Sequence, residues 1–468
     1  MSDGGPRVLD ARRNWRRPLI RAALNVKNPN VLSEIELIRS IEWSADKVAN
    51  LQIERTEQLL LHAWAQTAYY REILEACGAV RNGKVDMGRF DDIPFLTKEI
   101  VRSQFERLTA AQLPNGRRAY ANRSGGSTGQ PLRFMQDNVY WDVTIATRTY
   151  HFSLGGKHLG EREMKIWGSE RDLQEGTIGL KAKVENWVYN RRFEQCFYLP
   201  EEKIQRILKS INSWKPKMLW CYRDGIYAIA QYINKHSIRM HSPAAIISGG
   251  ASLYPFMTEA IEKAFGSPAI SAYGSRELGA AACQCAEHKG MHIASNAHLI
   301  EAIGSDGRPV LDQDGELAIT PLMNYAMPMI RYRIGDRGRI TKRPCQCGRG
   351  FPLLDELSGR TIESLVNHRG EHVDPIYFVH LLGVMNECDE VSKFQVIQEL
   401  DGSVTINVVP RTGAAENEVN MDHDGIRKNI RLVMGPDCAV RFALVNDIPL
   451  TPSGKYPYVI RRVPATST

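Results

Sequence analysis

The chain has 468 residues, of which 43% are hydrophobic and 24% are charged, and its formal net charge is +7. This length exceeds one ordinary core, so we expect one large domain and one smaller domain. The balanced composition excludes a disordered, collagen-like or coiled-coil protein. The positive charge is too small and too diffuse to indicate a nucleic-acid-binding protein.

The sequence contains no run of 18 apolar residues, so no transmembrane segment is expected. Near the N-terminus, Arg12-Arg13 and Arg16-Arg17 are not followed by an apolar stretch, which argues against a signal peptide. We therefore expect a cytoplasmic protein with reduced cysteines. The arginine pairs fit a solvated arm better than a contact with a membrane surface or an acidic partner.

The first predicted elements are helical. Residues 33–76 have apolar positions at helical spacing, and Ser33–Glu36 is typical of an N-cap region. Ile93–Lys98 interrupts this pattern, and Thr97 is a candidate cap for a further helix. Between residues 120 and 340, short apolar runs alternate with amphipathic stretches, which predicts sheets covered by helices.

Residues 296–340 predict a meander of antiparallel hairpins instead. Its short strands are expected at 298–303, 315–320 and 331–334, separated by the turn pairs Asp306-Gly307 and Asp314-Gly315. A domain boundary is predicted at Ser358-Gly359-Arg360. Beyond it, a small α+β domain is expected, with strands at 391–398, 403–409 and 439–445.

The first candidate site is a loop rich in glycine and hydroxyl groups. It consists of Ser124, Gly125, Gly126, Ser127, Thr128, Gly129, Gln130 and Pro131. Such a loop can direct backbone N–H groups and hydroxyls at phosphate oxygens, although a surface turn is the alternative. It lacks the Gly-Lys-Ser/Thr ending of a P-loop, which argues against a P-loop NTPase.

Four further motifs offer groups that suit a nucleotide. They are Gly249-Gly250-Ala251, Tyr273-Gly274-Ser275-Arg276-Glu277, the strand ending at Asp336, and the turn ending at Lys455. Glycines after a strand allow close approach to a flat ligand, and a tyrosine can stack on a base. Glu277 can hold Mg²⁺, and Asp336 can accept hydrogen bonds from ribose. Each motif alone also fits an ordinary turn, and Lys455 alone fits a solvated side chain.

Together and in this order, the five motifs resemble the adenylate-forming superfamily of acyl-CoA synthetases, luciferase and nonribosomal peptide adenylation domains. The likeness spans roughly residues 90–460. Ile93–Lys98, the compact glycine loop and the helical leader look like the phenylacetate–CoA ligase-like branch, and Y-G-S-R-E is similar to the CapK-like proteins of capsular polysaccharide biosynthesis. The resemblance implies an α/β fold with a large multi-sheet adenylation domain (1–358, with the leader at 1–90) and a smaller, mobile α+β lid (359–468).

The resemblance also implies a role for each motif. The glycine loop, including Thr128 as a catalytic hydroxyl, wraps the β- and γ-phosphates of ATP. The nucleotide is further held by Gly249, Gly250, Ala251, Tyr273, Gly274, Ser275, Arg276, Asp336 and Arg360. Glu277 holds magnesium, and Lys455 bridges the carboxylate and the α-phosphate. Arg276 replaces the usual threonine, and Ile362 replaces the usual hinge aspartate or lysine, which bears on the second half-reaction.

Nine cysteines include two C-x-C pairs, Cys283/Cys285 and Cys345/Cys347. Cys285, His288, Cys345 and Cys347 offer four nitrogen and sulfur ligands, which suit a tetrahedral zinc ion. Cys283 and His292 are competing ligands, and the absence of a metal is the alternative. Zinc-bearing members of the branch have similar spacing, so the resemblance implies a structural zinc.

The resemblance implies ATP-dependent, AMP-forming activation of a small-molecule carboxylic acid, followed by acyl transfer to CoA. An amide or ester ligase of polysaccharide or secondary-metabolite biosynthesis, with an amine or hydroxyl acceptor, is the second hypothesis. A non-catalytic nucleotide-binding protein is the third. A homodimer is compatible with all of them. The carboxylate is not identified, because the aromatic residues Tyr140, Trp141, Trp167 and Tyr222 fit either a pocket or the core.

Overall fold

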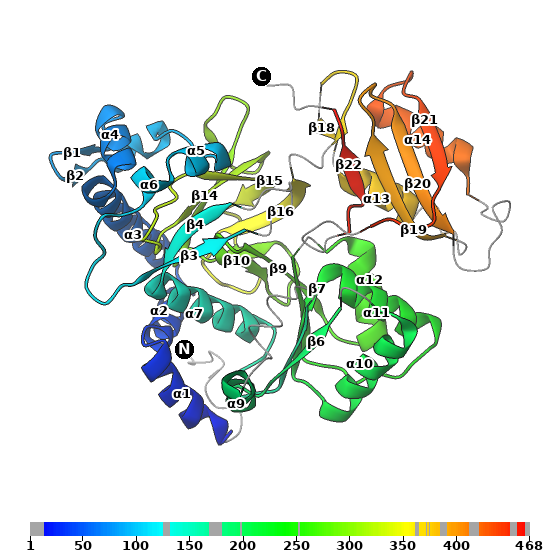
Figure 1. Cartoon of the computed structure of the whole chain (residues 1–468), viewed down its shortest axis with the longest axis horizontal. Helices are drawn as coiled ribbons and strands as arrows, with labels where there is room; N and C mark the ends of the chain where they lie inside the picture. Colours follow the sequence, from blue (N-terminus) through cyan, green and yellow to red (C-terminus); the bar gives the residue numbers. More distant parts are fainter. Residues whose placement is uncertain are drawn as a thin grey trace.

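The computed structural model describes most of the chain, and Figure 1 shows a large N-terminal part beside a small C-terminal part. The described residues are 14–124, 132–167, 180–196, 199–250, 253–360, 365–370, 372–373, 375–383, 391–410, 421–449 and 456–463. Among them, no helix combines the length and the apolar character that crossing a membrane requires.

Helices lead the described chain, as predicted. They are α1 (Arg16–Lys27), α2 (Val31–Ile41), α3 (Ala45–Gln66) and α4 (Ala68–Ala76). Ser44 and Thr67 divide the last three, because each hydroxyl accepts a hydrogen bond from the backbone N–H three residues on and so caps a new helix. The N-cap predicted at Ser33 is wrong. Helix α2 already begins at Val31, and the Ser33 hydroxyl donates to the carbonyl of Asn30 (3.0 Å).

A twelve-stranded sheet forms the centre of the large part, in the order β13-β12-β14-β15-β16-β11-β10-β9-β8-β7-β5-β6. The parallel strands are β5 (Glu163–Trp167), β6 (Arg191–Gln195), β7 (Met218–Tyr222), β8 (Ala245–Gly249) and β9 (Ala269–Ser275). The antiparallel strands are β10 (Gly279–Gln284), β11 (Met291–Ile293), β12 (His298–Ile303), β13 (Pro309–Val310), β14 (Asp314–Pro321), β15 (Tyr332–Thr341) and β16 (Leu353–Arg360). The predicted α/β class is therefore confirmed.

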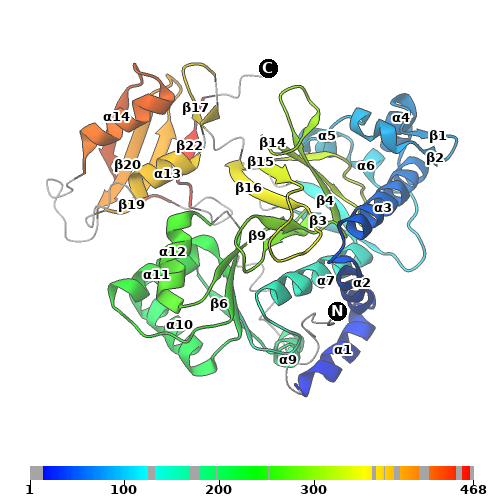
Figure 2. The same cartoon turned by 180° about the vertical axis from the view of Figure 1, so that it is seen from behind.

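Helices cover both faces of the parallel strands, as Figures 1 and 2 show. On one face lie α10 (Glu201–Trp214), α11 (Arg223–Lys235) and α12 (Pro255–Phe265); on the other lie α7 (Asn138–Leu154) and α9 (Leu180–Val188). Because side chains alternate along a strand, Met164 and Ile166 of β5 join the core under α10–α12. Lys165 points instead toward Trp220, whose ring packs with Phe152 of α7, while Trp167 at the end of β5 also contacts the core under α10–α12.

The predicted antiparallel meander is confirmed, because β12, β14 and β15 pair in succession. One of its two predicted turns is wrong. Asp306-Gly307 lies in the turn before β13, whereas Asp314 and Gly315 are already paired with β15. Gly315 is needed for close packing, since a Cβ there would lie 2.6 Å from the carbonyl oxygen of Ile303.

Short elements connect the leader helices to the sheet. They are β1 (Val80–Arg81), β2 (Lys84–Val85), η1 (Met87–Asp92), α5 (Lys98–Ser103), α6 (Phe105–Leu108), β3 (Ala119–Arg123) and β4 (Arg133–Asp137). Thr97 caps α5 as predicted, since its hydroxyl accepts a hydrogen bond from the N–H of Ile100 (3.3 Å). Strands β3 and β4 form a hairpin, and the glycine loop connects them.

The C-terminal part has a four-stranded sheet of its own, in the order β21-β20-β19-β22. Its elements are β17 (Leu365–Val366), β18 (His372–Val373), α13 (Pro375–Gly383), β19 (Val391–Gln398), β20 (Val404–Pro410), α14 (His423–Met434), β21 (Val440–Leu444) and β22 (Val459–Arg461). The three predicted strands are confirmed. Buried residues between Leu365 and Val459 form a separate core, against which Tyr254 and Phe256 of the large part also pack.

Candidate functional site

The predicted nucleotide residues Tyr273 and Asp336 are brought into direct contact. Tyr273 lies near the end of β9 and Asp336 lies within β15, 63 residues further along the chain. The Tyr273 hydroxyl donates a hydrogen bond to Oδ2 of Asp336 (2.8 Å), and each residue is only 8% exposed. This bond fixes the plane of the tyrosine ring relative to the carboxylate. The residues predicted to stack on a base and to accept hydrogen bonds from ribose are therefore held in one place.

The glycines of the second motif lie beside this pair, because β8 and β9 are neighbours in the sheet. Gly249 ends β8, and Gly250 follows with a φ of 88°. A Cβ on Gly250 would lie 2.4 Å from the ring of Tyr222, and one on Gly249 would lie 3.5 Å from the ring of Trp167. Glycine at position 250 therefore lets the ring of Tyr222 pack beneath this turn, whereas a Cβ on Gly249 would make only an ordinary contact with Trp167. Ala251 lies outside the described residues.

The turn after β9 is held by side chains from three other elements. Its consecutive carbonyls at residues 276–278 accept hydrogen bonds from Gln136 Nε2, Tyr140 Oη and His298 Nε2, at 2.9, 3.1 and 2.7 Å respectively. Burial lowers the pKa of His298 to about 4, so this imidazole is neutral at pH 7 and keeps its proton on Nε2 for the carbonyl. The turn is thus fixed from β4, α7 and β12.

This turn presents the carboxylate of Glu277 to the interior. Glu277 is buried, and within the described chain its carboxylate has neither a hydrogen-bond nor an ion-pair partner. The nearby hydroxyl of Tyr332 is also buried without a hydrogen-bond partner among those residues. Burial, together with the carboxylates of Glu277 and Asp336, raises the pKa of Tyr332. A buried carboxylate in such surroundings favours a cation, and oxygen ligands suit magnesium, so the residues fit the predicted ion.

The other predicted nucleotide residues are described only in part. Ser124 closes the base of the glycine loop, since its N–H donates to the carbonyl of Leu132 and its hydroxyl accepts from the N–H of Leu132 (both 2.9 Å). Ser275 Oγ accepts a hydrogen bond from the N–H of Leu278 (3.2 Å). Arg360 ends β16, where its backbone pairs with Asp336. The remaining predicted residues Gly125, Gly126, Ser127, Thr128, Gly129 and Lys455 lie outside the described residues.

Residues that follow Lys455 contact the large part at the carboxyl end of β7. The N–H of Tyr456 donates to Oδ2 of Asp224 (3.4 Å), at the start of α11. The guanidinium of Arg223 lies 5.3 Å from the ring of Tyr254 and 5.4 Å from that of Tyr458. The chain therefore returns close to the strand ends immediately after the predicted catalytic lysine.

A second cluster joins Cys285, His292, Cys345 and Cys347, whose ligand atoms all lie within 4.8 Å of one another. The sulfurs of Cys285 and Cys345 are 3.7 Å apart, and the sulfur of Cys347 is 3.3 Å from Nε2 of His292. Burial lowers the pKa of His292 to about 4, so it is neutral at pH 7, the form that binds metals. Three thiols and one imidazole fit a tetrahedral zinc ion.

The ligand predicted at His288 is wrong, and the competing residue His292 takes its place. His288 lies in the turn between β10 and β11 with a φ of 53°, outside the cluster. Strand β11 then returns antiparallel to β10, which sets His292 opposite Cys283 and beside Cys285. Cys283 is not part of the cluster either, since it packs with Phe152 and other apolar residues beneath the parallel strands.

The cysteine loop 345–351 also anchors the helical leader. Arg349 donates hydrogen bonds to Glu42 (3.2 Å) and to the hydroxyl of Tyr150 (3.1 Å), and the N–H of Gly350 donates to the carbonyl of Glu42 (2.8 Å). The guanidinium lies 4.9 Å from the centre of the Trp43 ring. A metal at this position would therefore link the β10–β11 hairpin, β15 and α2, which is a structural role.

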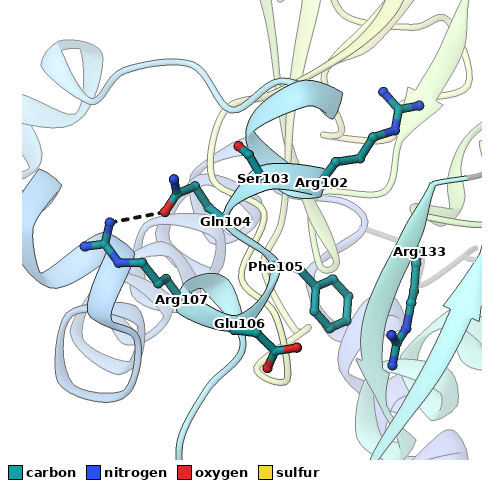
Figure 3. Close-up of a pocket in the computed structure, with 7 residues that line it drawn as sticks. All are labelled: Arg102, Ser103, Gln104, Phe105, Glu106, Arg107 and Arg133. Carbon is teal, nitrogen blue, oxygen red and sulfur yellow. Dashed lines mark hydrogen bonds between the residues drawn. The ribbon is translucent and has the colours of Figure 1, made fainter.

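An open hollow of about 540 Å³ lies over α5, α6 and the first residue of β4. It is lined by Arg102, Ser103, Gln104, Phe105, Glu106, Arg107 and Arg133 (Figure 3). Arg102 and Arg107 point away from each other there and pair with Glu99 (3.7 Å) and Glu72 (2.6 Å) respectively. Because these charges are balanced by carboxylates, the hollow does not by itself indicate an anionic ligand.

The aromatic pocket candidates divide between different roles. Trp141 is 44% exposed on the surface of α7, and Tyr140 is buried as a support for the Glu277 turn. Trp167 and Tyr222 pack near the glycine turn with ring centroids 5.5 Å apart. Sequence analysis did not single out Gln136 or the Tyr332 hydroxyl, because neither stands in a distinctive local pattern. Gln136 supports the turn after β9 by a hydrogen bond to the carbonyl of Arg276, and the Tyr332 hydroxyl lies near the carboxylate of Glu277.

Comparisons with known proteins agree with these motifs. Residues 365–462 match the CapK C-terminal domain family. Protein CapK of Staphylococcus aureus is 22% identical over 421 residues, which cover 88% of this chain and 89% of that protein. A phenylacetate–coenzyme A ligase of Thermus thermophilus is 23% identical over 77% of this chain and 80% of that protein.

A solved structure with the same fold is that of 2-hydroxyisobutyryl-CoA ligase in the postadenylation state, in complex with R3-HIB-AMP. It superposes with a TM-score of 0.70 at 18% identity, covering 90% of this chain and 91% of that one. The comparisons confirm the predicted resemblance and the predicted fold. The enzyme class predicted from the motifs is the class to which the named ligases belong.

Proposed function

We propose that this protein, a relative of CapK and of phenylacetate–coenzyme A ligases by sequence, is an ATP-dependent, AMP-forming ligase that activates a carboxylic acid. In the first step R-COO⁻ and ATP give R-CO-AMP and pyrophosphate. In the second, R-CO-AMP and an acceptor HX-R′ give R-CO-X-R′, AMP and a proton. The observation that carries the proposal is the contact of Tyr273 with Asp336 beside Gly249-Gly250. The buried carboxylate of Glu277, which has no ion-pair partner in the described part of the chain, supports it.

The proposed roles follow from these positions. Tyr273 stacks on the base while Asp336 accepts hydrogen bonds from the ribose hydroxyls. Glu277 would hold magnesium, which when bound neutralises charge on the phosphates. The glycine loop closed by Ser124 binds phosphate oxygens through its N–H groups. Lys455 directly precedes Tyr456, whose N–H contacts Asp224 at the start of α11. We assign to Lys455 the stabilisation of charge that develops on the α-phosphate in the transition state.

CoA is the proposed acceptor, since the named ligases among the relatives are CoA ligases. A hydroxyl or amine acceptor is the second candidate, and the match of residues 365–462 to the CapK C-terminal domain favours it. The acceptor binds after the adenylate forms, so this choice concerns the second half-reaction alone. Ile362 replaces the usual aspartate or lysine at the predicted hinge, and this departure concerns the same half-reaction.

We also infer that Cys285, His292, Cys345 and Cys347 hold a structural zinc ion. Four protein ligands leave no open coordination position, so the ion would stabilise the fold rather than take part in the reaction. Thiol ligands in this number also require a reducing compartment, which supports the proposed cytoplasmic location.

Adenylation is tested by pyrophosphate exchange across aryl, fatty, amino and uronic acids, each with and without CoA. At least one acid should support exchange without CoA, and CoA should then allow net release of AMP. Lys455→Ala should slow exchange by about 10²–10³, while Lys393→Ala, which removes an exposed partner of Asp447, should leave its rate unchanged. If no acid supports exchange although ATP binds, the protein is a non-catalytic nucleotide-binding protein.

A further inference from the structure

An aromatic group lies at the carboxyl ends of β5 and β7, where Trp220 packs with Phe152 of α7 and Trp167 also contacts the core under α10–α12. The ring centroids of Trp167 and Trp220 are 5.3 Å apart, and those of Trp167 and Tyr222 are 5.5 Å apart. Trp167 and Trp220 both keep part of their surface accessible, whereas Ile166 and Cys221, on the opposite face of the same strands, are fully buried. The two tryptophan side chains at the strand ends are therefore only partly covered, whereas the opposite face is closed by packing.

Two cations lie on these rings. The ammonium of Lys165 is 4.5 Å from the centre of the Trp220 ring and 5.0 Å from that of Trp167. The guanidinium of Arg148, from α7, is 5.1 Å from the centre of the Trp220 ring. Cations favour the faces of aromatic rings, so Trp220 helps to hold both side chains at one place. We call Arg148, Lys165, Trp167 and Trp220 the cationic aromatic face.

The charge of Arg148 has no paired carboxylate among the described residues. Within the described chain, its guanidinium makes no hydrogen bond and no ion pair. Burial, followed by the positive charge of Arg191, lowers the pKa of Arg148 to about 10, with Glu163 acting in the opposite direction. Glu163 itself is already paired with Lys157 at 2.8 Å. Arg148 remains protonated at pH 7 and lacks the anion that such a charge ordinarily acquires.

This face adjoins both sides of the candidate nucleotide site. The ring of Trp167 lies 3.5 Å from the position of a Cβ on Gly249, and so directly supports the glycine turn. On α7, one helical turn before Arg148, Thr144 lies 2.5 Å from the position of a Cβ on Gly279, which ends the Glu277 turn. An acid whose carboxylate reacts near Glu277 would therefore extend toward Arg148. The carboxyl ends of parallel strands are also where α/β proteins ordinarily bind ligands.

We propose that the acid activated by this protein carries a second anionic group, which Arg148 binds at the cationic aromatic face. The inference rests on the proposed function. The planar guanidinium suits a carboxylate, phosphonate or sulfonate, to which it donates two parallel hydrogen bonds. The rings of Trp167 and Trp220 pack against the carbon skeleton between the two anionic groups. Substrates of this class are dicarboxylic acids and carboxylic acids with a phosphorus or sulfur oxyanion.

The test compares pairs of acids of equal length that differ only at the far end, by pyrophosphate exchange. Suitable pairs are adipate with hexanoate and terephthalate with 4-methylbenzoate, and 4-phosphonobenzoate distinguishes a phosphonate from a carboxylate. The doubly charged acid should have a kcat/KM at least tenfold above that of its partner. In Arg148→Met, the ratio of kcat/KM for the doubly charged acid to kcat/KM for its singly charged partner should fall about 10- to 100-fold. The fall should arise mainly from a higher KM for the doubly charged acid, as expected for the loss of a charge-assisted contact. Arg148→Lys should give a ratio between those of the wild-type protein and Arg148→Met.

Arg192→Met is the matched control. Arg192 is exposed on β6, on the face away from Arg148, with its guanidinium 4.6 Å from the ring of Trp214. The Arg192→Met substitution should leave the ratio of the two kcat/KM values unchanged. If the wild-type protein prefers the singly charged acid of each pair, or if Arg148→Met lowers both acids by one factor, the inference is wrong while the proposed function stands.

If no acid supports exchange, the proposed function is wrong. Calorimetric titration of the same acids in the presence of AMP then still decides the role of Arg148. If the doubly charged acids bind and Arg148→Met raises their Kd at least tenfold, the result would support an anion site. If the doubly and singly charged acids have the same Kd, the anion site would be overturned.

Discussion

Removing the carboxylate of Asp336 should weaken ATP binding more than it weakens binding of the acid. Asp336→Ala deletes the proposed acceptor of the ribose hydroxyls in a buried position, where no water takes its place readily. Leaving such hydroxyls without an acceptor costs about 1–3 kcal/mol. That range corresponds to about a 5- to 150-fold increase in the Kd of ATP.

The hydrogen bond from Tyr273 makes a direct test of this role possible. Asp336→Ala also leaves the Tyr273 hydroxyl without its 2.8 Å partner, so part of the loss could arise from a displaced ring. Tyr273→Phe keeps the ring and removes only the hydroxyl, and it should raise the Kd of ATP less than Asp336→Ala does. The double variant then measures how strongly the two side chains act together.

Calorimetric titration of ATP, and separately of the activated acid, provides the measurement. Asp314→Ala is the control, because Asp314 is an exposed aspartate that pairs with Arg337 on the neighbouring strand. An unchanged Kd for ATP in Asp336→Ala would refute the ribose role. If Tyr273→Phe alone reproduced the whole loss, Asp336 would act by positioning the tyrosine and not by binding ribose.

Three further predictions concern the lysine turn, the metal cluster and pH. Lys455→Ala should slow pyrophosphate exchange by about 10²–10³ with little change in ATP affinity, while acyl transfer from synthetic acyl-adenylate survives; equal loss of both steps would contradict domain rotation. Cys345→Ser should lower the zinc content from about one ion per chain and lower the melting temperature, and an unchanged melting temperature would contradict a structural metal. Because burial holds the pKa of His298 near 4, against about 6.5 when unfolded, its contribution to stability is present above pH 6.5 and is lost as pH falls through 4. About 3 kcal/mol of unfolding free energy should be lost by pH 4, and His298→Gln should lose less in urea titrations; parallel pH profiles would contradict this.

Local sequence patterns were sufficient for the architecture. Apolar runs that alternate with amphipathic stretches predicted sheets covered by helices, and short strands separated by turn pairs predicted the meander. The order of the five motifs predicted the fold through their resemblance to a known superfamily. Asp336 was expected at the end of a strand, which is wrong, because β15 continues beyond it to Thr341. The helical leader was predicted as one region, and hydroxyl caps at Ser44 and Thr67 divide it.

The turn predicted at Asp314-Gly315 and the zinc ligand predicted at His288 were wrong, and both errors arose from contacts between strands. Gly315 serves close packing against Ile303, which has the same local signature as a turn. His292 replaces His288 because the register of β10 with β11 returns the chain to Cys285. The spacing of residues along the chain determines neither the register of paired strands nor which backbones approach each other closely.

By itself, the sequence determined the order of elements, the residue types of the nucleotide motifs and the presence of a cysteine cluster. Only the tertiary structure decided that Tyr273 donates to Asp336 and that Arg148 lies on Trp220. It also decided that, among the residues that the structure describes, neither the buried carboxylate of Glu277 nor the guanidinium of Arg148 has an ion-pair partner. The physical reason is that charge compensation depends on distance and burial. Groups from β9, β15 and α7 are far apart in the chain. They come close together and become buried only when the sheet is assembled.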